Sequence, residues 1–146
     1  GCSLLARAEM IREIGLLDES YILYFDDIDW CVKARERGWK VLYVPQSVLY
    51  HKVSRTTNQT KSPRYFYYYS RNYLLFFAKH FPSRFPRALS CWWRDFVWRF
   101  ARRTELTYMA ASIGGALGMA SAVARGALRA RAPLPGDRRP PAPGRP

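Results

Sequence analysis

The chain has 146 residues, of which 49% are hydrophobic and 16% aromatic, so it can build a packed core and is not a disordered tail. Its three cysteines are widely spaced, which argues against a disulfide scaffold or a zinc cage. The net charge is +13, yet eight of the eleven acids lie within residues 1–36 and twelve arginines follow residue 80. The basic C-terminal half indicates an anionic partner: a membrane surface, a nucleic acid or a diphosphate-bearing substrate.

The first third of the chain predicts two short helices followed by strands. In "RAEMIREIG" the apolar residues recur at helical spacing, and Gly15 stands where a helix would end. A second helix is expected from about Phe25 to Arg37, because Gly38 suits the left-handed residue after a helix. The β-rich runs "WKVLYVP" and "SVLYHKV" flank Pro45 and Gln46, and they predict two short strands or one broken strand.

The rest of the chain is mainly helical in pattern. The segment "RYFYYYSRNYLLFFAKHF" is long enough for a helix, although its aromatic residues would also suit a strand. "PRALSCWWRDFVWRFARR" is amphipathic, with aromatic residues on one face and arginines on the other. The nineteen uncharged residues from Leu106 to Ala124 could span a bilayer, but Ala, Gly and Ser dominate them. We therefore expect a packed or interfacial helix there in preference to a span.

Three acids, Asp26, Asp27 and Asp29, open the second predicted helix. Carboxylates this close repel one another, so at least one should have a raised pKa unless a cation or the helix dipole compensates. Such a cluster can bind a metal through its oxygens, act as a general base on a hydroxyl, or merely cap the helix.

The acids belong to a longer ordered pattern. Its positions are Gly1, Cys2, Leu5, Arg7, Glu9, Gly15, Asp18, Glu19, Tyr24, Asp26, Asp27, Asp29, Trp30, Gly38, Trp39, Pro45 and His51. In this order they resemble the C-terminal part of the catalytic domain of family 2 glycosyltransferases, nearest to the rhamnosyltransferase and galactofuranosyltransferase-like branch. "YYYSRNYLLFFAKHFP" resembles the tyrosine-rich helix that follows in the same proteins, so the resemblance covers residues 1 to about 82.

The resemblance implies an α/β fold. Residues 1–82 would be the acceptor-side, C-terminal half of a GT-A (Rossmann-like) catalytic domain, and amphipathic C-terminal helices would follow it. Residues 83–131 would form a helical, membrane-interfacial segment, and 132–146 a disordered Pro/Arg-rich tail. The chain begins at Gly1, and the family's donor-binding half has no counterpart in it. We therefore expect a fragment of a longer enzyme that is inactive alone.

The same resemblance implies an activity and its residues. The family transfers a sugar, with inversion, from a nucleotide-sugar donor to a hydroxyl of a glycan or lipid-linked acceptor, as in cell-surface polysaccharide synthesis. The family's general base maps onto Asp27, with Asp26 and Asp29 as supporting or acceptor-binding groups. Arg71 and Asn72 are candidates for contacts to the acceptor or to the diphosphate, and capping or packing roles are the alternative.

The resemblance also implies a divalent cation, Mn²⁺ or Mg²⁺, near the donor diphosphate. The family's downstream histidine, which can be a metal ligand, maps onto His51, although a lone histidine after an apolar run can equally be structural. Imidazole with carboxylates suits Mn²⁺ better than Mg²⁺. The family's D-x-D metal motif lies in the absent half, so we do not assign that role to the "DID" of residues 27–29.

The Trp/Arg-rich C-terminal half is predicted to dock peripherally on anionic lipid at the cytoplasmic face of the cell membrane. Two alternatives stay open: a basic, aromatic-rich module that binds nucleic acid or an anionic membrane without catalysis, and a helical membrane-associated structural protein. The aromatics stand at helical spacing and no nucleic-acid motif is present, so we do not expect a nucleic-acid partner.

Overall fold

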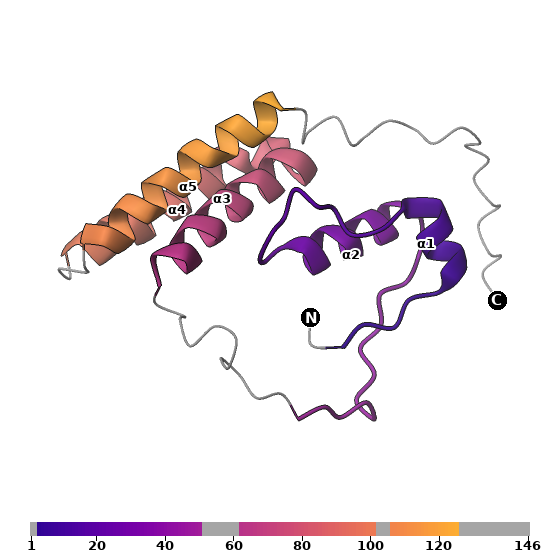
Figure 1. Ribbon diagram of the computed structural model, residues 1–146. Helices are drawn as coiled ribbons and strands as arrows, with labels where there is room; N and C mark the ends of the chain where they lie inside the picture. The colour runs from indigo at the N-terminus through magenta and orange to yellow at the C-terminus, as the bar shows by residue number, and fades with distance from the viewer. Residues whose placement is uncertain (1–2, 51–61, 102–105, 126–146) are drawn as a thin grey trace.

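A computed structural model describes residues 3–50, 62–101 and 106–125. Its helices are α1 (Ala8–Ile14), α2 (Asp26–Glu36), α3 (Pro63–His80), the 3-10 turn η1 (Pro82–Arg84), α4 (Phe85–Ala101) and α5 (Leu106–Ala124). Figure 1 shows α3, α4 and α5 lying together as one helical group, with α1 and α2 beside it. The predicted disordered tail, residues 132–146, lies outside the described residues.

Helices α1 and α2 end where the sequence predicts. Gly15 follows α1 with φ of +81°, and Gly38 lies two residues beyond α2 with φ of +85°, a conformation that favours glycine. Two indole groups join the pair: Trp30 Nε1 donates to the carbonyl of Gly15 at 2.9 Å, and Trp39 Nε1 donates to Glu13 at 2.7 Å. Both helix predictions are confirmed.

The strands predicted around Pro45 are not formed in residues 39–50, and no strand occurs in the part of the chain that the structure describes. A strand needs a neighbour to accept and donate its backbone hydrogen bonds, and no described segment pairs with this one. Its apolar side chains are left exposed, including Tyr43 at 89% and Tyr50 at 94%. The strand prediction is wrong for residues 39–50, and the α/β GT-A fold stays a prediction of the resemblance.

The tyrosine-rich segment forms α3, which is the central helix of the group. The hydroxyl of Ser62 accepts a hydrogen bond from the Tyr65 amide at 3.2 Å, and Pro63 occupies the first turn, so the helix begins at a favourable cap. Leu74 and Leu75 are completely buried. Of the two predictions for this segment, the helix is therefore correct. Its apolar residues, spaced for a helix, are buried in the core.

Helix α5 lies against α3 through its glycines. A Cβ on Gly115 would come within 2.2 Å of the Tyr67 carbonyl oxygen, and one on Gly118 within 2.5 Å of the Tyr67 hydroxyl. Small residues let two helix backbones approach in this way. Among the described residues, α5 is also the one helix whose length and composition would allow it to cross a membrane.

The glycine contact gives a matched pair of substitutions. Gly115→Ala should lower the free energy of unfolding by about 1–3 kcal/mol, because the methyl group meets backbone that cannot move aside. Gly114→Ala should be neutral or stabilising by up to about 1 kcal/mol, because its Cβ would lie 3.5 Å from the Tyr67 ring and alanine favours the helix. Urea unfolding followed by circular dichroism measures both. Equal stabilities would show that α5 does not pack on α3 in this register.

Candidate functional site

A turn of unusual conformation leads into the acids of α2. Tyr24 and Phe25 have φ of +64° and +71°, in the left-handed region that non-glycine residues occupy at a cost of about 1–3 kcal/mol each. Asn72 of α3 is fully buried beneath this turn, and its side-chain amide donates to the carbonyls of Leu23 at 2.5 Å and Tyr24 at 3.1 Å. The turn is therefore fixed by a side chain almost fifty residues away in the chain.

Arg71 holds the preceding part of the loop. Its guanidinium donates to the carbonyl of Ser20 at 2.8 Å and to the side-chain oxygen of Asn72 at 2.5 Å. Both predicted contact residues, Arg71 and Asn72, are thus buried and directed at the loop before α2. In the described contacts they hold the loop that leads to Asp26 and Asp27, which is the packing alternative, and a contact to the acceptor or to the diphosphate stays a prediction.

The third acid, Asp29, is completely buried among cationic groups. Its Oδ1 receives a hydrogen bond from Lys79 Nζ at 2.8 Å and lies 2.6 Å from His80 Nε2, while its Oδ2 lies 2.8 Å from Lys33 Nζ. Burial acts to raise the pKa of the Asp29 carboxyl, but the contacts with His80, Lys33 and Lys79 outweigh it and hold that pKa well below its usual range. The Asp29 carboxyl is therefore charged at neutral pH, and its supporting or acceptor-binding role stays a prediction.

Lys79 extends this cluster to the loop between α1 and α2. Its ammonium donates to Asp18 Oδ2 at 2.5 Å as well as to Asp29. Burial acts to lower the pKa of Lys79, and the two carboxylates more than reverse the shift, so its pKa is raised. Burial, followed by the charges of Asp29 and Asp18, raises the pKa of Tyr21 as well. The group Asp18, Asp29, Lys33, Lys79 and His80 is called the ion cluster below.

The ion cluster changes the interpretation of the acidic triplet. The sequence predicts that one of the three acids has a raised pKa unless a cation compensates, and for Asp29 the cations of α2 and α3 compensate. Sequence reasoning missed Lys79 and His80. The signal was present, since Lys79 follows Asn72 by seven residues and so lies on the same face of α3.

Asp26 and Asp27 occupy the first turn of α2 and are half-buried. Successive helical residues are rotated by about 100°, so Asp26, three residues before Asp29, shares its face, whereas Asp27 projects from the other side. The Asp27 carboxylate accepts a hydrogen bond from the Ile28 amide at 2.9 Å. A carboxylate at this place can accept a proton from a hydroxyl group without disturbing the ion cluster.

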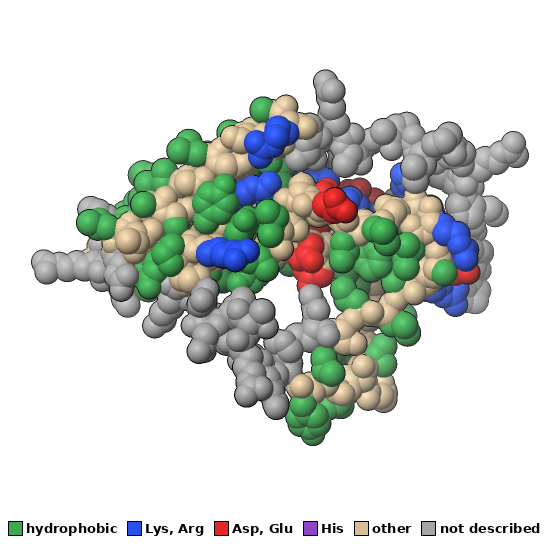
Figure 2. Space-filling view, in the orientation of Figure 1, with side chains coloured by type: hydrophobic (Ala, Val, Ile, Leu, Met, Phe, Trp, Pro, Cys, Tyr) green, Lys and Arg blue, Asp and Glu red, His purple; other side chains and the backbone are tan. Residues whose placement is uncertain are grey.

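Figure 2 shows Asp and Glu side chains near the middle of the view. Lys or Arg side chains lie over the helical group of α3, α4 and α5 and also on the side of α1 and α2. Both signs of charge therefore occur around the acids on this face.

The described residues contain no group of three or more His, Cys, Asp or Glu side chains that could hold a metal ion. The carboxylate of Asp29 does not fit a metal, because ammonium and imidazole groups already face its oxygens. The predicted metal ligand His51 lies outside the described residues.

Among curated proteins, the chain is similar to the N-acetylglucosaminyl-diphospho-decaprenol L-rhamnosyltransferases of two Mycobacterium tuberculosis strains. The identity is 26% over 94 residues, which is 64% of this chain and 28% of each relative. The chain thus spans less than a third of the length of the curated relatives it matches. No protein-family model and no solved structure matches it. The similarity relates part of the chain to a glycosyltransferase.

The ion cluster predicts a stability effect. Asp29→Asn should lower the free energy of unfolding by about 3–5 kcal/mol, because it leaves the buried ammonium of Lys79 short of a partner. Glu9→Gln removes a carboxylate that is 64% exposed and lies 3.8 Å from Arg12, so it should cost less than about 1 kcal/mol. Urea titration at neutral pH measures both.

The same variant tests the pH dependence. Because folding lowers the pKa of Asp29, its contribution is fully present above the unfolded value of about 3.8 and is lost as the pH falls toward the lower folded pKa. The free energy of unfolding of Asp29→Asn should therefore fall less steeply than that of the parent as the pH is lowered. If the free energy of unfolding of the variant depends on acid pH as that of the parent does, Asp29 is not charged in the folded protein.

Proposed function

We propose that this chain is the acceptor-side part of an inverting glycosyltransferase. It would transfer a sugar from a nucleotide-sugar donor to a hydroxyl of a glycan or lipid-linked acceptor. The observation that carries the proposal is the placement of Asp27 directly after a left-handed turn that buried Asn72 holds in place. The partial similarity to the mycobacterial rhamnosyltransferases supports the same chemistry.

The reaction would be a single displacement. The carboxylate of Asp27 accepts the proton of the acceptor hydroxyl while the hydroxyl oxygen forms a bond to the anomeric carbon of the donor sugar. The bond from that carbon to the nucleoside diphosphate breaks, and the diphosphate leaves with the electron pair on the opposite face. The attack therefore inverts the anomeric centre, and a general base on the attacking side is typically worth a factor of about 10²–10⁴ in rate.

The turn explains why a buried amide matters to this chemistry. A base that is displaced by about an ångström loses much of its effect, so the acid must be held by a rigid support. The left-handed conformations at Tyr24 and Phe25 cost free energy, and the hydrogen bonds of Asn72 together with aromatic contacts to α3 compensate for it. Asp26, on the side of the ion cluster, would tune Asp27 or contact the acceptor.

Three further parts of the proposal concern the donor. The nucleotide would bind to an α/β, GT-A half that is not represented in this chain, so the chain alone would be inactive. A divalent cation, Mn²⁺ or Mg²⁺, would offset the charge of the donor diphosphate. His51 remains the predicted ligand from this chain.

In the whole enzyme, Asp27→Asn should lower kcat by a factor of about 10²–10⁴, because the amide cannot accept the proton, while the affinity for the donor stays unchanged. Glu9→Gln removes the charge of an exposed carboxylate on α1, and it is the control that should retain activity. Transfer is measured with radiolabelled donor, and donor affinity by calorimetry. Loss of donor affinity in Asp27→Asn would show that the residue is not the base.

We also propose that α4 rests on the anionic cytoplasmic face of the cell membrane. Leu89, Trp93 and Val97 follow one another at every fourth residue and are exposed on this helix at 42%, 56% and 45%. The exposed arginines Arg87 and Arg94 lie to one side of this stripe. Tryptophan prefers the headgroup level of a bilayer, and arginine binds anionic phosphate. A surface that carries both therefore favours binding to an anionic membrane. A basic aromatic surface can also grip nucleic acid, which is the competing function.

Co-sedimentation with phosphatidylglycerol vesicles separates the two. Trp93→Ser should reduce the bound fraction several-fold, and binding to phosphatidylcholine vesicles should be weak. Leu16→Ser changes an apolar side chain that is 77% exposed far from α4 and should bind as the parent does. Tighter binding to a DNA duplex than to the vesicles would favour the non-catalytic module.

A further inference from the structure

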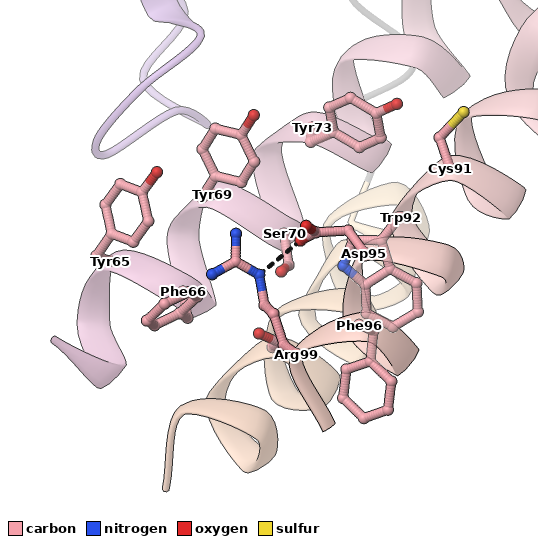
Figure 3. A pocket seen from close by; sticks show the side chains of 11 residues that line it. Tyr65, Phe66, Tyr69, Ser70, Tyr73, Cys91, Trp92, Asp95, Phe96 and Arg99 are labelled. Atoms are coloured by element: carbon pink, nitrogen blue, oxygen red, sulfur yellow. Dashed lines mark hydrogen bonds and ion pairs between the residues drawn. The ribbon is translucent and has the colours of Figure 1, made fainter. Parts of the chain in front are cut away.

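An open cavity of about 260 Å³ lies between α3 and α4, and Ser112 of α5 contributes to its lining (Figure 3). Its lining combines aromatic rings with hydroxyl and charged groups: Tyr65, Phe66, Tyr69, Ser70, Tyr73, Cys91, Trp92, Asp95, Phe96, Arg99 and Ser112. The chemistry proposed above uses none of these side chains.

Two rows of aromatic rings form the walls. On α3, Tyr65, Tyr69 and Tyr73 follow one another at every fourth residue, with ring centroids 5.6 and 6.3 Å apart and planes within 20° of parallel. On α4, the Trp92 and Phe96 rings stack at 5.7 Å. Figure 3 shows the two rows on separate helices with the polar groups between them.

The charged groups in the lining compensate each other. Arg99 Nε donates to Asp95 Oδ2 at 2.7 Å, and the side chains remain 38% and 55% exposed. The guanidinium carbon of Arg99 also lies 5.2 Å from the centre of the Phe66 ring. The lining therefore carries no net charge, yet it keeps both a strong acceptor and strong donors within reach of a ligand.

This combination selects among ligand classes. A diphosphate would meet an arginine that is already paired with a carboxylate, so the contact would add little to its binding free energy. A hydrocarbon chain would remove water from that ion pair and offer no hydrogen bond in return, which is unfavourable. A neutral sugar fits both features, because its C–H face packs on aromatic rings while its hydroxyls bond to carboxylate, guanidinium and tyrosine groups.

The tyrosine row also touches the turn that carries Asp27. The rings of Tyr24 and Tyr65 lie 5.3 Å apart, and those of Phe25 and Tyr69 lie 5.7 Å apart. One wall of the cavity is therefore in contact with the turn that precedes Asp26 and the proposed base, Asp27. We propose that the cavity binds a neutral sugar ring of the acceptor. The sugar binding stands on the cavity alone, and its acceptor role rests on the proposed function.

The test is a calorimetric titration of the whole protein, without donor, with the methyl glycoside of N-acetylglucosamine. This sugar is chosen because it appears in the names of the mycobacterial relatives. Asp95→Asn keeps the shape of the cavity and should weaken binding at least tenfold, and Trp92→Phe should weaken it less. Trp98→Ala, on the same helix but outside the cavity, should bind as the parent does. Inorganic pyrophosphate should not compete.

The outcomes separate this inference from the proposed function. If the glycoside binds and Asp95→Asn weakens it, the inference holds even in a protein that shows no transfer. If transfer occurs but Asp95→Asn changes neither glycoside affinity nor the acceptor KM, the cavity is not the sugar site. Equal weakening by Asp95→Asn and Trp98→Ala, or displacement by pyrophosphate, would also overturn it.

Discussion

The carboxylate of Asp29 meets Lys33, Lys79 and His80 inside the molecule, and the position of α2 on α3 depends on this contact. Buried charges are costly unless each has its partner in place, so they tolerate few alternative arrangements. A slip of α2 by one residue would turn Asp29 toward another side and leave the ammonium of Lys79 with only Asp18. The ion cluster thus fixes the rotation of α2, and with it the direction in which Asp27 projects.

Helix α3 contacts α2 and its preceding loop with one face and α5 with another, because the residues on these faces differ. One face presents Asn72, Lys79 and His80 to the loop and to α2. Another face meets α5 at Tyr67, where glycines allow close approach. The tyrosine row lies beside the first of these faces and lines the cavity toward α4. A segment with so many aromatic residues can meet all these neighbours only as a helix, since a strand would offer it two faces.

Local features of this chain were predictable, and distant contacts were not. The ends of α1 and α2 follow from Gly15 and Gly38, whose conformational freedom is a property of the residue itself. The bond between Asp29 and Lys79 joins residues fifty positions apart, and the α3 face that Lys79 shares with Asn72 does not by itself identify Asp29 as its partner. The run around Pro45 has the composition of a strand, but a strand exists only with a partner, and none is among the described residues. The role of Asn72 beneath a left-handed turn was hidden because Tyr24 and Phe25 carry no glycine signal.

The turn before Asp27, the proposed base, and one wall of the cavity both contact α3, and this has a mechanical consequence. Asn72 fixes the turn before Asp27, while Tyr65 and Tyr69, on an adjacent stripe of α3, contact that turn and line the cavity. A helix is stiff over this length, so a sugar held between the aromatic rows would keep a constant distance from the base. Proximity of this kind lowers a reaction barrier without any additional chemical group. The tyrosine-rich helix would then contribute to transfer by holding the acceptor and the base in one rigid frame.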